Sequence, residues 1–328
     1  MNAQMKSLGR SKAERDIKVV TLSAGTTTAE IWTYGGRLHK LDIQAGKKKQ
    51  SILVSPSDPV GKPSFAGAAV GRVANIIKKA QFEFQGKKYS LEENFNGDHI
   101  HGGTKGFHSR NWEVADIRPD EAMVRLYTRI RTEEDSYPGM LEVTLTYRLE
   151  ENALHTEFRA QSSHNTLFAP TLHPFFNLSG ARNIKDHKLT IPLQYFQKLE
   201  DGVPKGRPVA VKGWNDLTKG AKLESIMTGP RADILNLCWI RDGLPSMEHL
   251  CTLEADNGIA LAVHSSMPAL QVYTSNTMKE DGLRSFSGIA LEPEYPPDSA
   301  NRVMKNRIGL FAGDARMERI TYKWKASE

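Results

Sequence analysis

The sequence predicts an all-β fold, a large antiparallel β-sandwich with very little helix. The clearest observation is a run over residues 141–149 in which apolar side chains alternate with polar ones. A period of two places the apolar side chains on one face of a strand and the polar ones on the other. Shorter runs of the same kind recur at residues 123–130, 154–160, 189–192, 260–264, 270–274 and 318–324. Only residues 218–228 have a weakly helical pattern, so the strands determine the fold class.

The chain has the composition of one large domain that begins near residue 18. Residues 1–17 are polar, and we expect them to form a flexible N-terminus. From Val19 onward short strands alternate with turns, with neither an internal repeat nor a long linker. Residues 82–91 predict a β-hairpin, because alternating aromatic residues flank the turn Gln85-Gly86. We therefore predict a single domain over residues 18–328.

The charge and the cysteines exclude several classes of protein. Lys and Arg number 44 against 38 Asp and Glu, and the excess is dispersed apart from the run 47–49, which argues against a nucleic-acid partner. No apolar run approaches the roughly 20 residues of a membrane span, and residues 1–18 lack the apolar core of a signal peptide. Cys238 and Cys251 have apolar neighbours and no metal-binding spacing. We expect a cytoplasmic protein without a membrane partner.

Residues 287–301 contain the first candidate catalytic group. The apolar residues 289–291 predict a buried strand that reaches the carboxylate of Glu292. Pro293 follows at once, and since proline cannot donate a ladder hydrogen bond, we expect the strand to stop or to reach a sheet edge here. A carboxylate at the end of a buried strand is costly to build without a function.

Two glycine-rich segments supply further polar candidates. Residues 67–75 are small apart from Arg72 and Asn75, which either donate to a ligand or, for Arg72, pair with a buried carboxylate. In the second segment, residues 98–103, His99 and His101 would share a face if the backbone were extended. That spacing suits a chelating pair, but a third ligand at a defined spacing is missing, so we predict no metal site.

His173 lies in an apolar and aromatic run, residues 170–178. A neutral imidazole in such a run is a candidate acid/base group near neutral pH, and the neighbouring Phe175 and Phe176 offer a platform for a sugar ring. With His101 and Glu292 it forms an acid/base set without a nucleophile. The sequence contains no phosphate-binding loop and no dinucleotide fingerprint, so a proton-transfer reaction without a cofactor is the simplest interpretation.

Together these segments resemble the galactose mutarotase (aldose 1-epimerase) family, in the family's order from about Val19 to Trp324. The matching segments are residues 71–75, 101–107 with Trp112, 137–139, 173–180, 273–276, and 291–301. The resemblance implies the large β-sandwich called a supersandwich, with an open sugar-binding cleft. It also implies a monomer or homodimer whose partner is a small sugar and that needs no metal or organic cofactor.

The same resemblance implies roles for individual residues. Glu292 corresponds to the catalytic base and His173 to the catalytic acid. His101 corresponds to a second active-site histidine and Asn75 to an asparagine near the sugar hydroxyls. We count both with the substrate-binding candidates, together with Arg72 as a donor of residues 67–75. In the implied reaction Glu292 removes the proton of the C1 hydroxyl while His173 protonates the ring oxygen, and the opened sugar closes again as the other anomer.

The chain also departs from the family pattern at positions that hold the sugar. Ile76 stands where the family usually has a second arginine, and the usual aspartate falls near Leu235, with Asn236 the nearest polar candidate. Glu294 replaces the usual glutamine two residues after the base, and we count it with the substrate-binding candidates. We expect specificity altered from galactose and glucose.

Two alternatives remain open from the sequence. One is a carbohydrate-binding or regulatory protein without significant turnover, which the losses at Ile76 and Leu235 favour. The other is an enzyme for a sugar phosphate or a lactone, in which Lys78, Lys79 or Arg110 would meet the phosphate.

Overall fold

The computed structural model describes the chain except residues 11–15, 59, 62–63, 201, 228–235, 242–245, 277, 280–282, 303–306 and 327–328. Three antiparallel sheets make up most of it, which confirms the predicted all-β class. In spatial order the largest sheet contains β12 (Glu113–Arg118), β13 (Met123–Ile130), β14 (Leu141–Glu150), β15 (Ala153–Ser162), β31 (Ala315–Lys325), β27 (Ala260–Ser265), β26 (Glu248–Glu254), β19 (Lys188–Thr190) and β24 (Ala221–Lys222).

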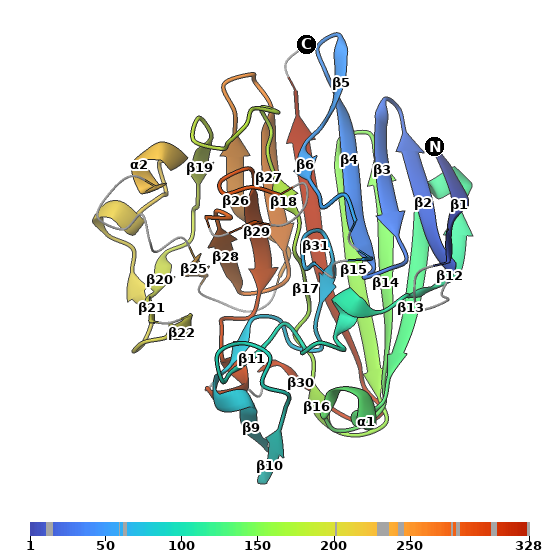
Figure 1. The fold of residues 1–328 in the computed structure, drawn as a ribbon. Coiled ribbons are helices and arrows are strands. Elements are labelled where there is room, and N and C mark those ends of the chain that lie inside the picture. The colour runs from blue at the N-terminus through green and yellow to red at the C-terminus, as the bar shows by residue number, and fades with distance from the viewer. Residues whose placement is uncertain are drawn as a thin grey trace.

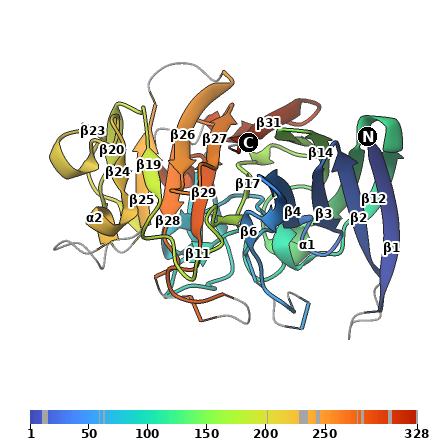
Figure 2. The same ribbon diagram turned by 90° about the horizontal axis from the view of Figure 1, so that it is seen from above.

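Two smaller sheets cover one face of this nine-stranded sheet (Figures 1 and 2). The seven-stranded sheet contains, in order, β23 (Val209–Ala210), β20 (Tyr195–Gln197), β25 (Asn236–Ile240), β28 (Ala269–Tyr273), β29 (Ile289–Glu294), β18 (Phe175–Phe176) and β6 (Leu53–Val54). The five-stranded sheet contains β1 (Asn2–Arg10), β2 (Asp16–Ala24), β3 (Thr27–Trp32), β4 (Arg37–Ala45) and β5 (Lys48–Ser51). Strands β2 and β3 contact β13 and β14, while β29 contacts β27.

Short elements complete the described part of the chain. Paired strands are β7 (Ala69–Val70) with β17 (Thr171–Leu172), β8 (Ile76–Ile77) with β11 (His99–Ile100), β9 (Gln81–Phe84) with β10 (Lys87–Ser90), β16 (Thr166–Leu167) with β30 (Gly309–Leu310), and β21 (Leu199–Glu200) with β22 (Val203–Pro204). The α-helices are α1 (Thr132–Asp135) and α2 (Leu223–Met227), and single 3₁₀ turns occur at 78–80, 107–109, 119–121, 213–215 and 299–301. Helix α2 falls inside the weakly helical stretch that the sequence indicated.

Strand β14 shows how the sequence pattern builds the core. Its burial alternates strictly, with Leu141, Val143, Leu145, Tyr147 and Leu149 buried and the residues between them partly exposed. The apolar set faces the five-stranded sheet, and the hydroxyl of Tyr147 donates to the carbonyl of Gly36 over 2.7 Å. The predicted hairpin is also present as β9 and β10.

The structure corrects two expectations about strands. The N-terminus was expected to be flexible, but residues 2–10 form β1, the edge strand that pairs with β2. Backbone hydrogen bonds hold this strand, so its polar side chains gave no signal. The strand containing Glu292 does not stop there either, because β29 continues through Pro293 to Glu294. Its neighbour β18 pairs only with residues 289–290, so Pro293 lies beyond the end of β18, where a missing donor is tolerated.

Among the described residues no helix is long and apolar enough to cross a membrane. Cys238 and Cys251 are both buried and unpaired, as the sequence indicated. Several polar side chains gather around β28 and β29, in the middle of the seven-stranded sheet.

Candidate active site

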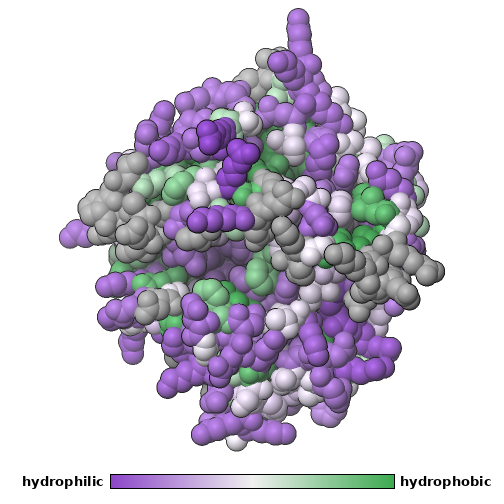
Figure 3. Space-filling view, viewed as in Figure 1, coloured by the Kyte–Doolittle hydropathy of each residue, from purple (hydrophilic) through white to green (hydrophobic). Residues whose placement is uncertain are grey.

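A cleft of about 330 Å³ opens beside β28 and β29. The face of the molecule in front of these strands is hollowed in the space-filling view (Figure 3). The polar lining of the cleft comes from Asn75, His101, His173, Asn236, Gln271 and Glu292. Its apolar lining comes from Phe65, Phe95, Ile100, Phe175, Tyr273 and Met278. Five site candidates, Glu292, His173, His101, Asn75 and Asn236, therefore lie in one cleft although the chain separates them by up to 217 positions (292 − 75).

His173 and Glu292 are in direct contact in this cleft. Nε2 of His173 lies 3.3 Å from Oε2 of Glu292, and both side chains are buried. The backbone of His173 is fixed, since its N–H donates to Ala68 and its carbonyl accepts from Gly67. The imidazole is further packed between the rings of His101 and Phe175, with centroids 5.4 and 5.1 Å away. The pair is thus held in place before any ligand enters.

Burial opposes charge on both members of this pair. It lowers the pKa of His173 to about 4, with a smaller contribution from the charge of Arg37. It raises the pKa of Glu292 well above its usual value, and the charge of Glu294 adds to that shift. The pair therefore has two protonation states with the same number of protons. In one, Glu292 holds the proton and His173 is neutral; in the other, Glu292 is a carboxylate and His173 an imidazolium. One proton shared across 3.3 Å therefore lets either residue act as acid or base.

Asn75 and His101 come from two turns that support each other. Both residues have positive φ angles, 60° and 55°. The N–H of Asn75 donates to Nδ1 of His101 over 3.2 Å, and the N–H of His101 donates to the carbonyl of Asn75. Burial lowers the pKa of His101 well below its usual value, so the ring is neutral. With Nδ1 accepting, Nε2 carries the hydrogen and is a donor for a ligand.

The metal pair considered for His99 and His101 does not form. The positive φ of His101 breaks the extended backbone that would have placed both rings on one face. Nδ1 of His99 lies 2.8 Å from the carbonyl oxygen of Glu92, and its ring packs against Tyr137. Within the described residues there is no group of three or more His, Cys, Asp or Glu side chains placed to hold a metal ion.

Arg72 was predicted to bind substrate, and the structure contradicts this. Its guanidinium is completely buried away from the cleft and forms a bidentate ion pair with Asp135 at 2.7 and 2.8 Å. Its remaining nitrogen donates to the carbonyls of Pro138 and Gly139. The alternative considered from the sequence, a buried pair with a carboxylate, is the one that the structure has. The buried guanidinium therefore supplies hydrogen-bond donors to the carbonyl groups of the turn after α1.

Glu294 also lies outside the cleft lining, although it was counted as a substrate-binding candidate. Residues two apart in a strand share a face, so Glu294 follows Glu292 on the same side of β29. Glu294 is fully buried, and Oε1 accepts a 2.7 Å hydrogen bond from the side-chain amide of Asn75. Glu294 therefore contacts Asn75, which lines the cleft, but does not line the cleft itself.

The other departures from the family pattern have these places in the structure. Ile76 is buried in β8 and does not line the cleft. Asn236 does line it, and its side-chain oxygen accepts a hydrogen bond from Gln271. Asp233 and Leu235 lie outside the described residues.

The cations considered for a phosphate are elsewhere. Lys78 pairs with Asp98 at 3.0 Å and Arg110 with Glu134 at 2.9 Å, and neither these residues nor Lys79 line the cleft.

Sequence reasoning missed much of the cleft wall. Gln271 stands directly opposite Glu292 in the pairing of β28 with β29, and Tyr273 stands opposite Ala290. Their alternation along β28 was visible, but the register that brings them to Glu292 was not. Phe65, Phe95 and Met278 come from loops with no periodic signal. Of the two aromatic residues proposed as a platform, Phe175 lines the cleft while Phe176 packs against Tyr322 in the core.

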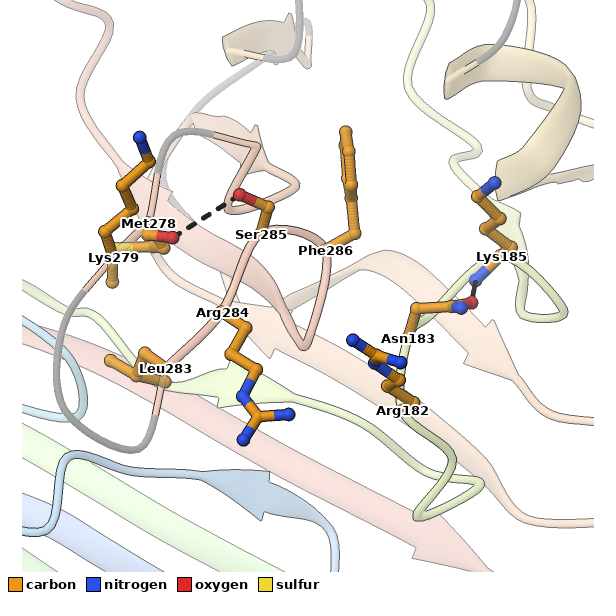
Figure 4. Close-up of a pocket in the computed structure, with 9 residues that line it drawn as sticks. All are labelled: Arg182, Asn183, Lys185, Met278, Lys279, Leu283, Arg284, Ser285 and Phe286. Carbon is orange, nitrogen blue, oxygen red and sulfur yellow. Dashed lines mark hydrogen bonds between the residues drawn. The ribbon is translucent and has the colours of Figure 1, made fainter.

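A second, more open pocket of about 570 Å³ adjoins the first, and Met278 lines both. Its walls are the loop segment 278–286, in its described residues, and residues 182–185 (Figure 4). The side chains of Arg182, Lys185, Lys279 and Arg284 are exposed around it, and none of them is ion-paired with another described residue. Glu280 and Asp281 lie outside the described residues.

Comparison with known proteins agrees with this geometry. The family model for aldose 1-epimerase matches residues 18–323. The maltose epimerase of Levilactobacillus brevis is 28% identical over 353 aligned positions, covering 97% of this chain and 98% of that protein. The galactose mutarotase of Mus musculus is 32% identical and covers 86% of each chain. The crystal structure of galactose 1-epimerase from Lactobacillus acidophilus aligns over the whole of both chains with a TM-score of 0.87 at 22% identity. The chain belongs to the aldose 1-epimerase family.

Proposed function

We propose that Glu292 and His173 interconvert the α and β anomers of an aldose bound in the 330 Å³ cleft. The observation that supports this most strongly is the contact between the two side chains, 3.3 Å apart and buried in the wall of a cleft that fits a sugar ring. Apart from the contact with His173, Oε2 of Glu292 has no polar partner in the described protein, so this oxygen can also accept a hydrogen bond from a substrate hydroxyl.

The chemistry needs only proton transfers. Glu292 as carboxylate takes the proton of the C1 hydroxyl, and the imidazolium of His173 gives its proton to the ring oxygen, so the C1–O5 bond breaks and the aldehyde forms. Rotation about C1–C2 presents the other carbonyl face. The ring oxygen then attacks C1, returns its proton to His173, and the new C1 oxygen takes the proton from Glu292. Acid and base each end as they began.

The remaining cleft residues would hold the sugar. Nε2–H of neutral His101 and the amides of Asn236 and Gln271 present hydrogen-bonding groups to hydroxyls. Phe175 and Tyr273 offer apolar surface to the C–H face of a ring. Because Ile76 replaces the family's second arginine and is buried, this cleft holds its sugar with neutral donors, and we propose a specificity altered from galactose and glucose.

A panel of aldoses tests this proposal. Each pure anomer is added to the protein, and the approach to anomeric equilibrium is followed by NMR against the buffer rate. Among the relatives, one is named a maltose epimerase and others galactose mutarotases, so the panel includes disaccharides as well as hexoses. Accelerated exchange for at least one sugar supports the proposal. Calorimetric binding of a sugar without accelerated exchange would favour the binding protein without turnover instead.

A second candidate function is the same reaction on an aldose that has an anionic substituent, such as a sugar phosphate. The four cations around the adjoining pocket, Arg182, Lys185, Lys279 and Arg284, favour it, since Met278 lines both pockets and a sugar in the cleft could extend past it (Figure 4). A sugar phosphate would then have a lower KM than the neutral sugar, and added salt would weaken its binding. The double variant Lys185→Ala/Arg284→Ala should remove that preference, while Lys88→Ala on β10 should keep it.

A cytoplasmic location and a monomeric or dimeric state stay predictions.

A further inference from the structure

We propose that Glu294 holds the negative charge of a buried carboxyl pair and thereby sets the pH up to which Glu292 and His173 keep the proton that they share. This inference rests on the proposed function for Glu292 and adds a positioning residue to it. The family usually has a neutral glutamine at this position, so the effect belongs to this chain.

The geometry brings the two carboxyl groups together without a countercharge. Both lie on the same face of β29, two positions apart, and both are buried, with exposed fractions of 2% and 0%. No Lys or Arg among the described residues forms an ion pair with either of them. Two carboxylates on one face of a buried strand repel each other, and the charge of Glu294 raises the pKa of Glu292, so their protons leave in two coupled steps.

The surroundings decide which of the two carboxyl groups ionises first. The side-chain amide of Asn75 donates to Oε1 of Glu294 over 2.7 Å, and this hydrogen bond stabilises the carboxylate form of Glu294. Apart from the 3.3 Å contact with His173, Oε2 of Glu292 has no partner in the described protein, so no amide donor stabilises the carboxylate form of Glu292. Burial raises the pKa of both groups, but the bond from Asn75 lowers that of Glu294, while the charge of Glu294 raises that of Glu292 further.

The other titratable groups near the pair do not compensate this charge. Cys238 of β25 and Tyr322 of β31 are buried, which raises their pKa values and keeps them uncharged at neutral pH. On β28, the residues paired with Glu292 and Glu294 are Gln271 and Ala269, neither of which titrates. His173, from the link between β17 and β18, is the group that shares a proton with Glu292.

The consequence concerns the pH at which Glu292 loses its proton. As the pH rises, Glu294 ionises first, and its charge makes Glu292 keep its proton to higher pH than burial alone would require. Anomer exchange needs that proton on the pair of Glu292 and His173, so it should persist into the alkaline range and fall only when the pair loses it. Glu294→Gln removes the charge with little change in shape, so Glu292 should lose its proton at lower pH.

The experiment compares wild type, Glu294→Gln and, as a control on β26 outside the cleft, Glu254→Gln. The falling limb of kcat/KM against pH should move at least about one unit lower in Glu294→Gln, the shift expected for strongly coupled groups, and stay in place in Glu254→Gln. Circular dichroism checks that the variants are folded. Superimposable profiles for folded wild type and Glu294→Gln would overturn the inference.

A second measurement separates this inference from the proposed function. Carboxyl ¹³C NMR of protein labelled at the glutamate side chain follows both titrations without any sugar, with Glu292→Gln and Glu294→Gln used for assignment. Two coupled steps, with the Glu292 signal titrating at lower pH in Glu294→Gln, support the inference even if no sugar is turned over. Independent titrations, each unchanged by the other substitution, would contradict it whatever the activity.

Discussion

Nε2 of His173 lies 3.3 Å from Oε2 of Glu292, across the boundary between the β17–β18 link and the central strand β29. The two residues are 119 positions apart (292 − 173) and meet because β18 pairs with residues 289–290 of β29. Burial disfavours charge on each residue. A single proton held between them therefore rests on Glu292 and leaves both side chains neutral, and its transfer to His173 gives the carboxylate and the imidazolium that the ring opening uses.

The first prediction concerns the acid. His173→Gln keeps a side chain of similar size but cannot transfer a proton, so kcat for anomer exchange should fall about 10²–10⁴-fold. Sugar binding measured by calorimetry should change much less. His155→Gln, on the outer face of the nine-stranded sheet, serves as the control and should exchange like wild type. Near-normal kcat in His173→Gln would mean that another group protonates the ring oxygen.

The second prediction concerns the buried pair of Arg72 with Asp135. Arg72→Met leaves the carboxylate of Asp135 buried without its guanidinium, and the free energy of unfolding should fall by about 3–5 kcal/mol. The double variant Arg72→Met/Asp135→Leu removes both charges and should recover part of that loss. Because Arg72 does not line the cleft, the KM of folded Arg72→Met should remain that of wild type. A raised KM with unchanged stability would return Arg72 to the substrate-binding residues.

The third prediction concerns stability against pH. Burial raises the pKa of Glu294 in the folded state above its unfolded value of about 4.3, so the folded protein binds more protons above that pH. The stability from this group is complete below about pH 4.3 and is lost as the pH rises towards the folded pKa, by at most about 1.4 kcal/mol per unit.

Glu294→Gln should remove that loss. Urea unfolding of wild type between pH 5 and 8 should therefore show a steeper decline than the variant. Parallel curves would show that Glu294 is ionised throughout this range or that its pKa is unshifted.

The fourth prediction concerns sugar binding by Asn236. Its side chain lines the cleft and is oriented by Gln271. Asn236→Ala should raise KM about tenfold, as expected for the loss of one hydrogen bond of roughly 1.4 kcal/mol, with little change in kcat. Asn165→Ala, a partly exposed position outside the cleft, is the control. An unchanged KM in Asn236→Ala would leave Gln271 and His101 as the groups that hold the hydroxyls.

The sequence could predict those parts of the fold that repeat locally. The alternation over residues 141–149 identifies β14 because one face of that strand is buried along its whole length. Strand β1 escaped prediction because an edge strand held by backbone hydrogen bonds needs no apolar pattern. Glu292 was found from the apolar run before it, yet the strand runs on through Pro293, since the pairing of β29 with β18 ends earlier.

The parts of the site that could not be predicted from the sequence also depend on contacts between residues far apart in the chain. Residue types indicated Glu292 and His173, but nothing local could say whether the arginine of residues 67–75 faces a ligand or Asp135, 63 positions away. The bond from Asn75 to Glu294 spans 219 positions, and it decides that Glu294 belongs to the charge balance of the cleft and not to its lining. Such long-range pairings depend on sheet register, which a single sequence does not contain.

The most direct test of the account is the anomer exchange rate of the best sugar, measured by NMR magnetisation transfer at equilibrium for wild type and Glu292→Gln. The variant keeps the shape of the side chain but cannot accept the C1 hydroxyl proton. The account predicts fast exchange in wild type and exchange at the buffer rate in a folded variant that still binds the sugar. Equal, accelerated exchange in both proteins would contradict the assignment of Glu292 as the base.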